Sequence, residues 1–65
     1  MRWRNPQRGD YRIIETFLLL PRAIDEETRW FEICYIKQRY NGYLWYDWQF
    51  VEKCDYQRYK KTGEA

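Results

Sequence analysis

The fold of this chain is decided by the stretch RWFEICYIKQRYNGYLWYDWQFVE, residues 29–52, in which two strand-like segments flank Asn41-Gly42. Asn-Gly is the strongest short-range hairpin signal, because a type I′ turn needs a positive φ at both central residues. We therefore predict an antiparallel hairpin whose strands, residues 29–40 and 43–52, are joined by a two-residue turn.

The predicted turn also determines which side chains share a side of the hairpin, because side chains alternate along a strand. With Tyr40 opposite Tyr43, Tyr35 faces Trp48 on a side that is mainly apolar and aromatic. The other side mixes polar and aromatic residues, as protein interfaces often do. It supplies our candidate partner-binding residues: Trp30, Tyr40, Tyr43 and Trp45. Packing of these rings inside the protein is the competing interpretation.

The rest of the chain adds one strand before this hairpin and a short segment after it. Residues 12–20 are rich in β-branched and aromatic residues, and Pro21 ends that strand. Residues 22–28 are predicted to be a loop, or one helical turn capped by Asp25, because Asp25-Glu26-Glu27 is too acidic for a strand. The predicted fold class is mainly β (all-β or α+β), a three-stranded antiparallel meander with a short C-terminal helix or extension.

A length of 65 residues predicts a single small domain. It divides into a basic arm at residues 1–11, the meander at 12–56 and a C-terminal extension at 57–65, with disorder expected from Thr62. Either residues 53–56 prolong the last strand, or Asp55 caps a short helix that runs through Lys61, with Gly63 as its C-terminal stop. So short a chain removes only about 60% of its surface from water on folding. Because one short helix cannot cover a three-stranded sheet, we expect the arm or a second copy, as in a homodimer, to cover the rest.

The residue types argue against catalysis and against a bound metal or cofactor. The sequence has no histidine, which is the commonest general base and metal ligand, and its three glycines form no phosphate-binding loop. We therefore expect a chain that is not an enzyme and needs no cofactor.

The two cysteines are predicted to be free thiols. In the predicted register, Cys34 and Cys54 lie on opposite sides of the hairpin and about 17 Å apart along it, whereas a disulfide needs Cα atoms within roughly 7 Å. Free thiols favour the cytoplasm. The longest purely apolar run, residues 17–20, is too short to span a membrane.

Basic residues at the N-terminus suggest a second class of partner. Four arginines stand in the first twelve residues and could contact the phosphates of a nucleic acid: Arg2, Arg4, Arg8 and Arg12. The alternative is a solvated tail. A third possibility is a structural component of a larger assembly.

Three features, spread over residues 17–50, together resemble small accessory proteins encoded by tailed phages and prophages. They are the Phe17-x-x-Leu20-Pro21-Arg22 motif with its acidic loop, the segment Thr28-Arg29-Trp30-Phe31-Glu32, and a Trp-rich final strand. The resemblance carries no catalytic motif. It implies that the chain binds a host or phage protein in the host cytoplasm, and we predict a non-enzymatic protein-binding module.

Overall fold

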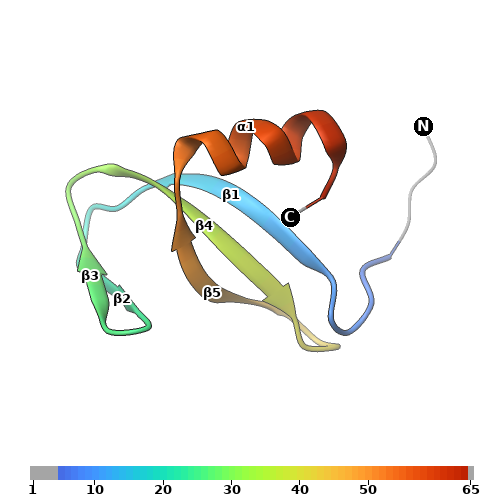
Figure 1. The fold of residues 1–65 in the computed structure, drawn as a ribbon. Helices are drawn as coiled ribbons and strands as arrows, with labels where there is room; N and C mark the ends of the chain where they lie inside the picture. The colour runs from blue at the N-terminus through green and yellow to red at the C-terminus, as the bar shows by residue number, and fades with distance from the viewer. Residues whose placement is uncertain (1–4, 65) are drawn as a thin grey trace.

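The computed structural model of the chain describes residues 5–64. It contains five strands and one helix (Figure 1): β1 (Tyr11–Phe17), β2 (Arg22–Ile24), β3 (Glu27–Arg29), β4 (Ile33–Tyr40), β5 (Trp45–Val51) and α1 (Lys53–Thr62). An antiparallel sheet has the order β1-β4-β5, and β2 and β3 form a separate two-stranded sheet. Strands make up 47% of the structure, so the mainly β class, the three-stranded meander and the short C-terminal helix are confirmed.

The segment at residues 22–28 is a β-hairpin, so the prediction of a loop or a helical turn is wrong. Asp25 and Glu26 form its turn, with φ values of 51° and 70°. Positive φ at both central residues is the pattern of a type I′ turn. Two acidic residues are therefore placed at a turn, and Glu27 pairs with Ile24 in the ladder.

The connection between β4 and β5 is longer than predicted. Tyr40 pairs with Trp45, so the loop consists of residues 41–44, and of these only Gly42 has a positive φ, at 103°. The side-chain Oδ1 of Asn41 accepts hydrogen bonds from the backbone N–H groups of Tyr43 and Leu44, at 2.9 and 3.0 Å. Asn41 thus closes the loop through its side chain, as Asn often does in turns, and not through a left-handed backbone.

A β-bulge further shifts the predicted register. Gln38 pairs with Asp47, but the next residue along, Lys37, pairs with Gln49, which leaves Trp48 unpaired. Tyr35 consequently faces Val51 and not Trp48. An extra residue of this kind strengthens the local twist of the strand.

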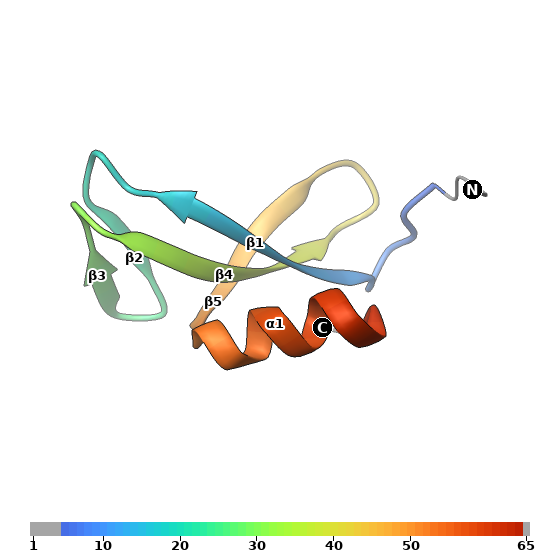
Figure 2. The ribbon, with the colours of Figure 1, turned by 90° about the horizontal axis from the view of Figure 1, so that it is seen from above.

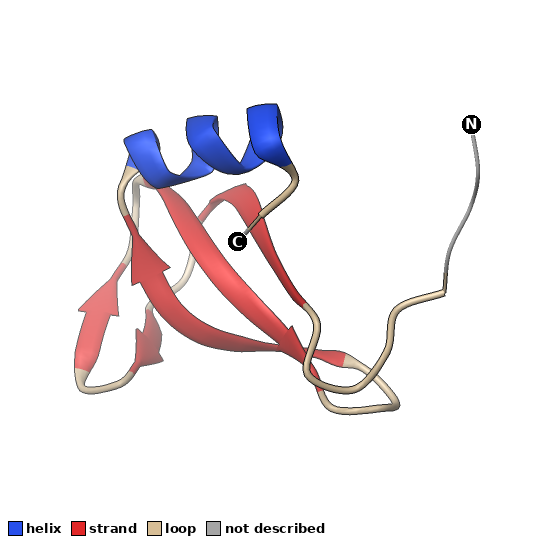
Figure 3. Ribbon diagram, turned by 45° about the vertical axis from the view of Figure 1, so that its right-hand side comes forward, coloured by secondary structure: helices blue, strands red, loops and turns tan. Residues whose placement is uncertain are grey.

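Each face of the three-stranded sheet is covered by a different element (Figures 1 and 3). α1 starts where β5 ends and runs toward the start of β1 (Figure 2), and the ring of Tyr56 lies 5.1 Å from that of Tyr35. We call this side the helix face. On the opposite side, the hairpin face, Arg29 of β3 lies 4.8 Å over the ring of Phe50 and Arg22 of β2 pairs with Asp47 at 3.5 Å.

The core lies mainly on the hairpin face. Its buried apolar residues are Leu18, Ile24, Cys34 and Ile36, while Ile13 is buried on the helix face. The predicted register places Cys34 and Ile36 on the mixed polar and aromatic side of the predicted hairpin, opposite the apolar side of Tyr35. In the structure, both residues are buried in the core. The reason is the β2–β3 hairpin, which supplies a cover that the sequence analysis did not include.

The helix has defined ends. Glu52 is its N-cap and forms a capping box with Asp55, so Asp55 is the third helical residue and not the cap. Gly63, with a φ of 75°, caps the C-terminus. Thr62 is the last helical residue, contrary to the disorder predicted from there, and Ala65 lies outside the described residues. Within residues 5–64, no helix is long and apolar enough to cross a membrane.

Candidate protein-binding surface

Exposed apolar side chains gather at the end of the sheet where β1 finishes and β4 begins. Phe17 and Ile33 are paired across the two strands, and the backbone N–H of Leu18 donates to the carbonyl of Glu32 at 3.0 Å. Six residues here are each more than half exposed: Phe17, Leu19, Leu20, Trp30, Phe31 and Ile33. We call this group the apolar tip.

The backbone of the apolar tip is strained at Phe31. Its φ is 56°, in the left-handed region that bulky residues rarely adopt. This conformation costs an L-residue about 1–2 kcal/mol. It is held by a hydrogen bond of 2.6 Å from the N–H of Phe31 to the carbonyl of Leu18. The result is an outward pair of stacked rings, Trp30 and Phe31, with centroids 5.2 Å apart.

Arg29 and Cys34 adjoin the residues of the apolar tip in the sequence and lie on the hairpin face. The Nε of Arg29 donates to the carboxylate of Glu27, and this hydrogen bond raises the pKa of Arg29. Cys34 is fully buried, and its burial, followed by the nearby charge of Glu32, raises the pKa of its thiol. A buried, protonated thiol is a poor nucleophile, so Cys34 is a packing residue.

The structure does not bring the four predicted partner-binding residues together. Tyr40 and Trp45 are neighbours on the hairpin face, with ring centroids 5.2 Å apart, and both are half-buried. Tyr43 lies in the loop and is 91% exposed. Trp30 is at the far end of β4, where it belongs to the apolar tip. Of the four, Trp30 belongs to the apolar tip, while Tyr43 has one exposed apolar neighbour in its loop, Leu44.

Two of the four arginines fall within the described residues. Arg2 and Arg4 lie outside the described residues, and Arg8 is exposed. Arg12 lies on the hairpin face, with its guanidinium 4.4 Å over the ring of Trp45 and its Nε donating to Gln38 at 2.8 Å. These contacts give Arg12 a structural role within the sheet.

Sequence reasoning missed most of the apolar tip. The residues not named as candidates are Phe17, Leu19, Leu20, Phe31 and Ile33. One signal was present, because residues 17–20 are apolar without the alternation expected of a half-buried strand. The predicted first strand, residues 12–20, includes this run, whereas β1 ends at Phe17.

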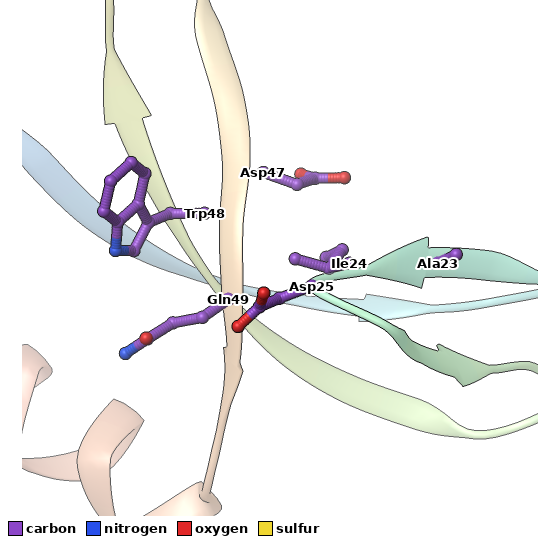
Figure 4. A pocket seen from close by; sticks show the side chains of 6 residues that line it. All are labelled: Ala23, Ile24, Asp25, Asp47, Trp48 and Gln49. Carbon is purple, nitrogen blue, oxygen red and sulfur yellow. The ribbon is translucent and has the colours of Figure 1, made fainter.

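A pocket of about 540 Å³ lies between the β2–β3 hairpin and β5 (Figure 4). Asp47 and Ile24 lie on one side of β5 there, and Trp48 and Gln49 project on the other. The carboxylate of Asp47 is already bound by Gln38 and Arg22. Across the part of the chain that the structure describes, no group of three or more Cys, Asp or Glu residues is placed to hold a metal ion.

Comparison with known proteins supplies no family for this chain. No family model matches it, and neither the curated proteins nor the solved structures gave a match.

Proposed function

We propose that this chain is a non-enzymatic protein-binding module that docks through the apolar tip. The observation that carries the proposal is the concentration of six large, mostly exposed apolar side chains at one end of the sheet. Exposed apolar patches on small proteins commonly mark interaction sites. A protruding surface of this kind suits another protein better than a small molecule, which favours a concave pocket.

The strain at Phe31 supports the same proposal. A bulky residue with a positive φ lowers stability, and such conformations cluster at functional sites. Here the strained residue is itself exposed and stacked on Trp30, so the strained conformation does not improve packing in the core. Presentation of the two adjacent rings to a partner would explain why the chain keeps this strained backbone at Phe31.

The biological setting is part of the proposal. The resemblance to accessory proteins of tailed phages suggests a host or phage protein as the partner, in the host cytoplasm. The free thiols of Cys34 and Cys54 suit such a reducing compartment. The alternative partners of the apolar tip are a second copy of the chain and a larger assembly.

Affinity capture with the immobilised chain tests the proposal. The test variant is Phe31→Asn, because Asn tolerates a positive φ and removes the apolar ring. The matched control is Tyr43→Asn, which removes an exposed ring from the loop at the other end of β4. We expect the wild type and Tyr43→Asn to retain the same partner and Phe31→Asn to lose it, with all three folded by circular dichroism.

The proposal is wrong if Phe31→Asn and Leu20→Asn both retain the partner at wild-type levels. Sedimentation velocity on the same proteins identifies a second copy as the occupant, since the wild type and Tyr43→Asn would then self-associate and Phe31→Asn would be monomeric.

A further inference from the structure

A second, partly exposed surface lies on the helix face, at the opposite end of β4 from the apolar tip. Tyr11, Arg39 and Tyr46 are paired in register across β1, β4 and β5, so their side chains form a line across the sheet. Lys37 and Trp48 lie beside this line. We call these five residues the cation–aromatic row.

In the row, cations lie on aromatic rings. The guanidinium of Arg39 is 5.7 Å from the ring centroid of Tyr11 and 5.3 Å from that of Trp48, and the Nζ of Lys37 is 4.6 Å from Tyr11. The rings also contact one another edge to face, with centroids 6.1 Å apart for Tyr11 and Trp48. Such contacts orient the cations without neutralising them.

The charges and rings of the row are available to a ligand. Among the described residues, no carboxylate forms an ion pair with Lys37 or Arg39. Tyr11 and Trp48 are 37% and 41% exposed, so part of each ring faces solvent. The surface therefore offers two positive charges without ion-pair partners next to partly exposed aromatic rings.

We infer that the cation–aromatic row binds single-stranded nucleic acid. Lys37 and Arg39 would contact phosphates, while Tyr11 and Trp48 would stack on bases, which is the combination that unspecific single-strand binders use. A duplex hides its base faces, and an acidic peptide has no bases to stack. The inference does not depend on the N-terminal arginines, and it concerns a surface separate from the apolar tip.

Fluorescence anisotropy with a labelled fifteen-nucleotide oligothymidylate tests the inference on the full chain. The test variants are Arg39→Gln and Tyr11→Leu. Their matched controls are Arg22→Gln, which removes the same charge on the hairpin face, and Tyr43→Leu, which removes a ring from the loop. We expect each test variant to weaken binding about tenfold and the controls to change it little.

Salt dependence and competition separate stacking from general charge attraction. Two phosphate contacts predict a log–log salt slope of about −1.4, since each contributes about −0.7 on a single strand. A hairpin duplex and poly-glutamate are expected to compete poorly. Backbone amide shifts from ¹H–¹⁵N spectra of the wild type provide a readout without variants, and we expect them to change at Tyr11, Arg39 and Trp48.

Four results would overturn the inference. One is the absence of binding at low salt. The second is an equal loss of affinity in Arg39→Gln and Arg22→Gln. The third is competition by poly-glutamate as strong as by the oligonucleotide. The fourth is a set of shift changes confined to residues near Arg8, which would assign binding to the N-terminal arm.

Discussion

The side-chain amide of Gln38 donates a hydrogen bond of 2.9 Å to the carboxylate of Asp47, across β4 and β5. Its Oε1 accepts from the Nε of Arg12 on β1, so the amide of Gln38 is satisfied on both sides. Asp47 is in turn paired with Arg22 of the β2–β3 hairpin. One polar chain therefore links the three strands of the sheet to the hairpin that covers it.

Because Gln38 is the centre of these polar contacts, we expect Gln38→Ala to destabilise the protein by about 1–3 kcal/mol. Gln38 is buried, and its removal leaves polar groups of Arg12 and Asp47 without their partner. Urea unfolding would measure the loss. The control is Gln49→Ala, an exposed glutamine on β5 that we expect to change stability by less than about 0.5 kcal/mol. Equal effects of the two substitutions would contradict the role given to the Gln38 amide.

Phe31→Gly is expected to leave the free energy of unfolding unchanged or to raise it by up to about 1 kcal/mol. Glycine relieves the positive φ, which offsets the loss of the stacked ring. Phe17→Gly is the comparison, because Phe17 is also more than half exposed but lies in regular β1, and this substitution should lower stability by about 0.5–1 kcal/mol. If Phe31→Gly proves the more damaging of the two, the backbone at Phe31 is not strained.

Replacing the turn pair Asp25-Glu26 by Asn-Gly should stabilise the β2–β3 hairpin by about 0.4–1 kcal/mol. Both positions have a positive φ, which Asn and Gly adopt more easily than Asp and Glu. Thermal unfolding would register a higher midpoint. An Ala-Ala replacement at the same positions is the control, and we expect it to lower the midpoint.

The thiol of Cys34 should make stability fall as the pH rises above about 9. Burial raises its pKa above the ordinary value of 9.0, so the folded chain keeps a proton that the unfolded chain releases. Stability from this source is complete below the unfolded pKa and is lost as the pH rises through the folded pKa. The fall should be smaller in Cys34→Val, while the contribution of the half-buried Tyr35 persists, because partial burial and then the nearby Glu15 raise the pKa of its hydroxyl.

A second measurement compares the reactivity of the two thiols at one fixed pH. Iodoacetamide should modify the exposed Cys54 quickly and Cys34 only when the chain unfolds. Mass spectrometry of the native protein would then find one modified cysteine. Rapid modification of both would show that Cys34 is accessible.

The hydrophobic pattern predicted the three main strands, but local turn rules did not predict the turns. Asn41-Gly42 has the residues of a type I′ turn, yet Asn41 uses its side chain to close a longer loop. Positions 25 and 26 hold Asp and Glu instead of the Asn and Gly that favour a type I′ turn, and both nonetheless adopt positive φ values. Packing of Ile24 into the core determines the hairpin there, and that contact is not visible in the local sequence.

The candidate surface was predictable only in part. Aromatic content indicated exposed rings, and Trp30, one of the four candidate partner-binding residues, is 54% exposed. Which face of the sheet is covered depends on the β2–β3 hairpin, and the unpaired Trp48 depends on a bulge. Both are tertiary features, and neither leaves a periodic signal in the sequence.

The contact between Tyr56 of α1 and Tyr35 of β4 has a consequence for how the two surfaces can be used together. On the helix face, Tyr35 stands between Ile33 of the apolar tip and Arg39 of the cation–aromatic row. The docked helix therefore lies between the two surfaces, so a protein at the apolar tip and a nucleic acid strand at the cation–aromatic row would contact different atoms. The chain would in that case work as a two-ended adaptor, which tethers a protein to a nucleic acid strand in one ternary complex.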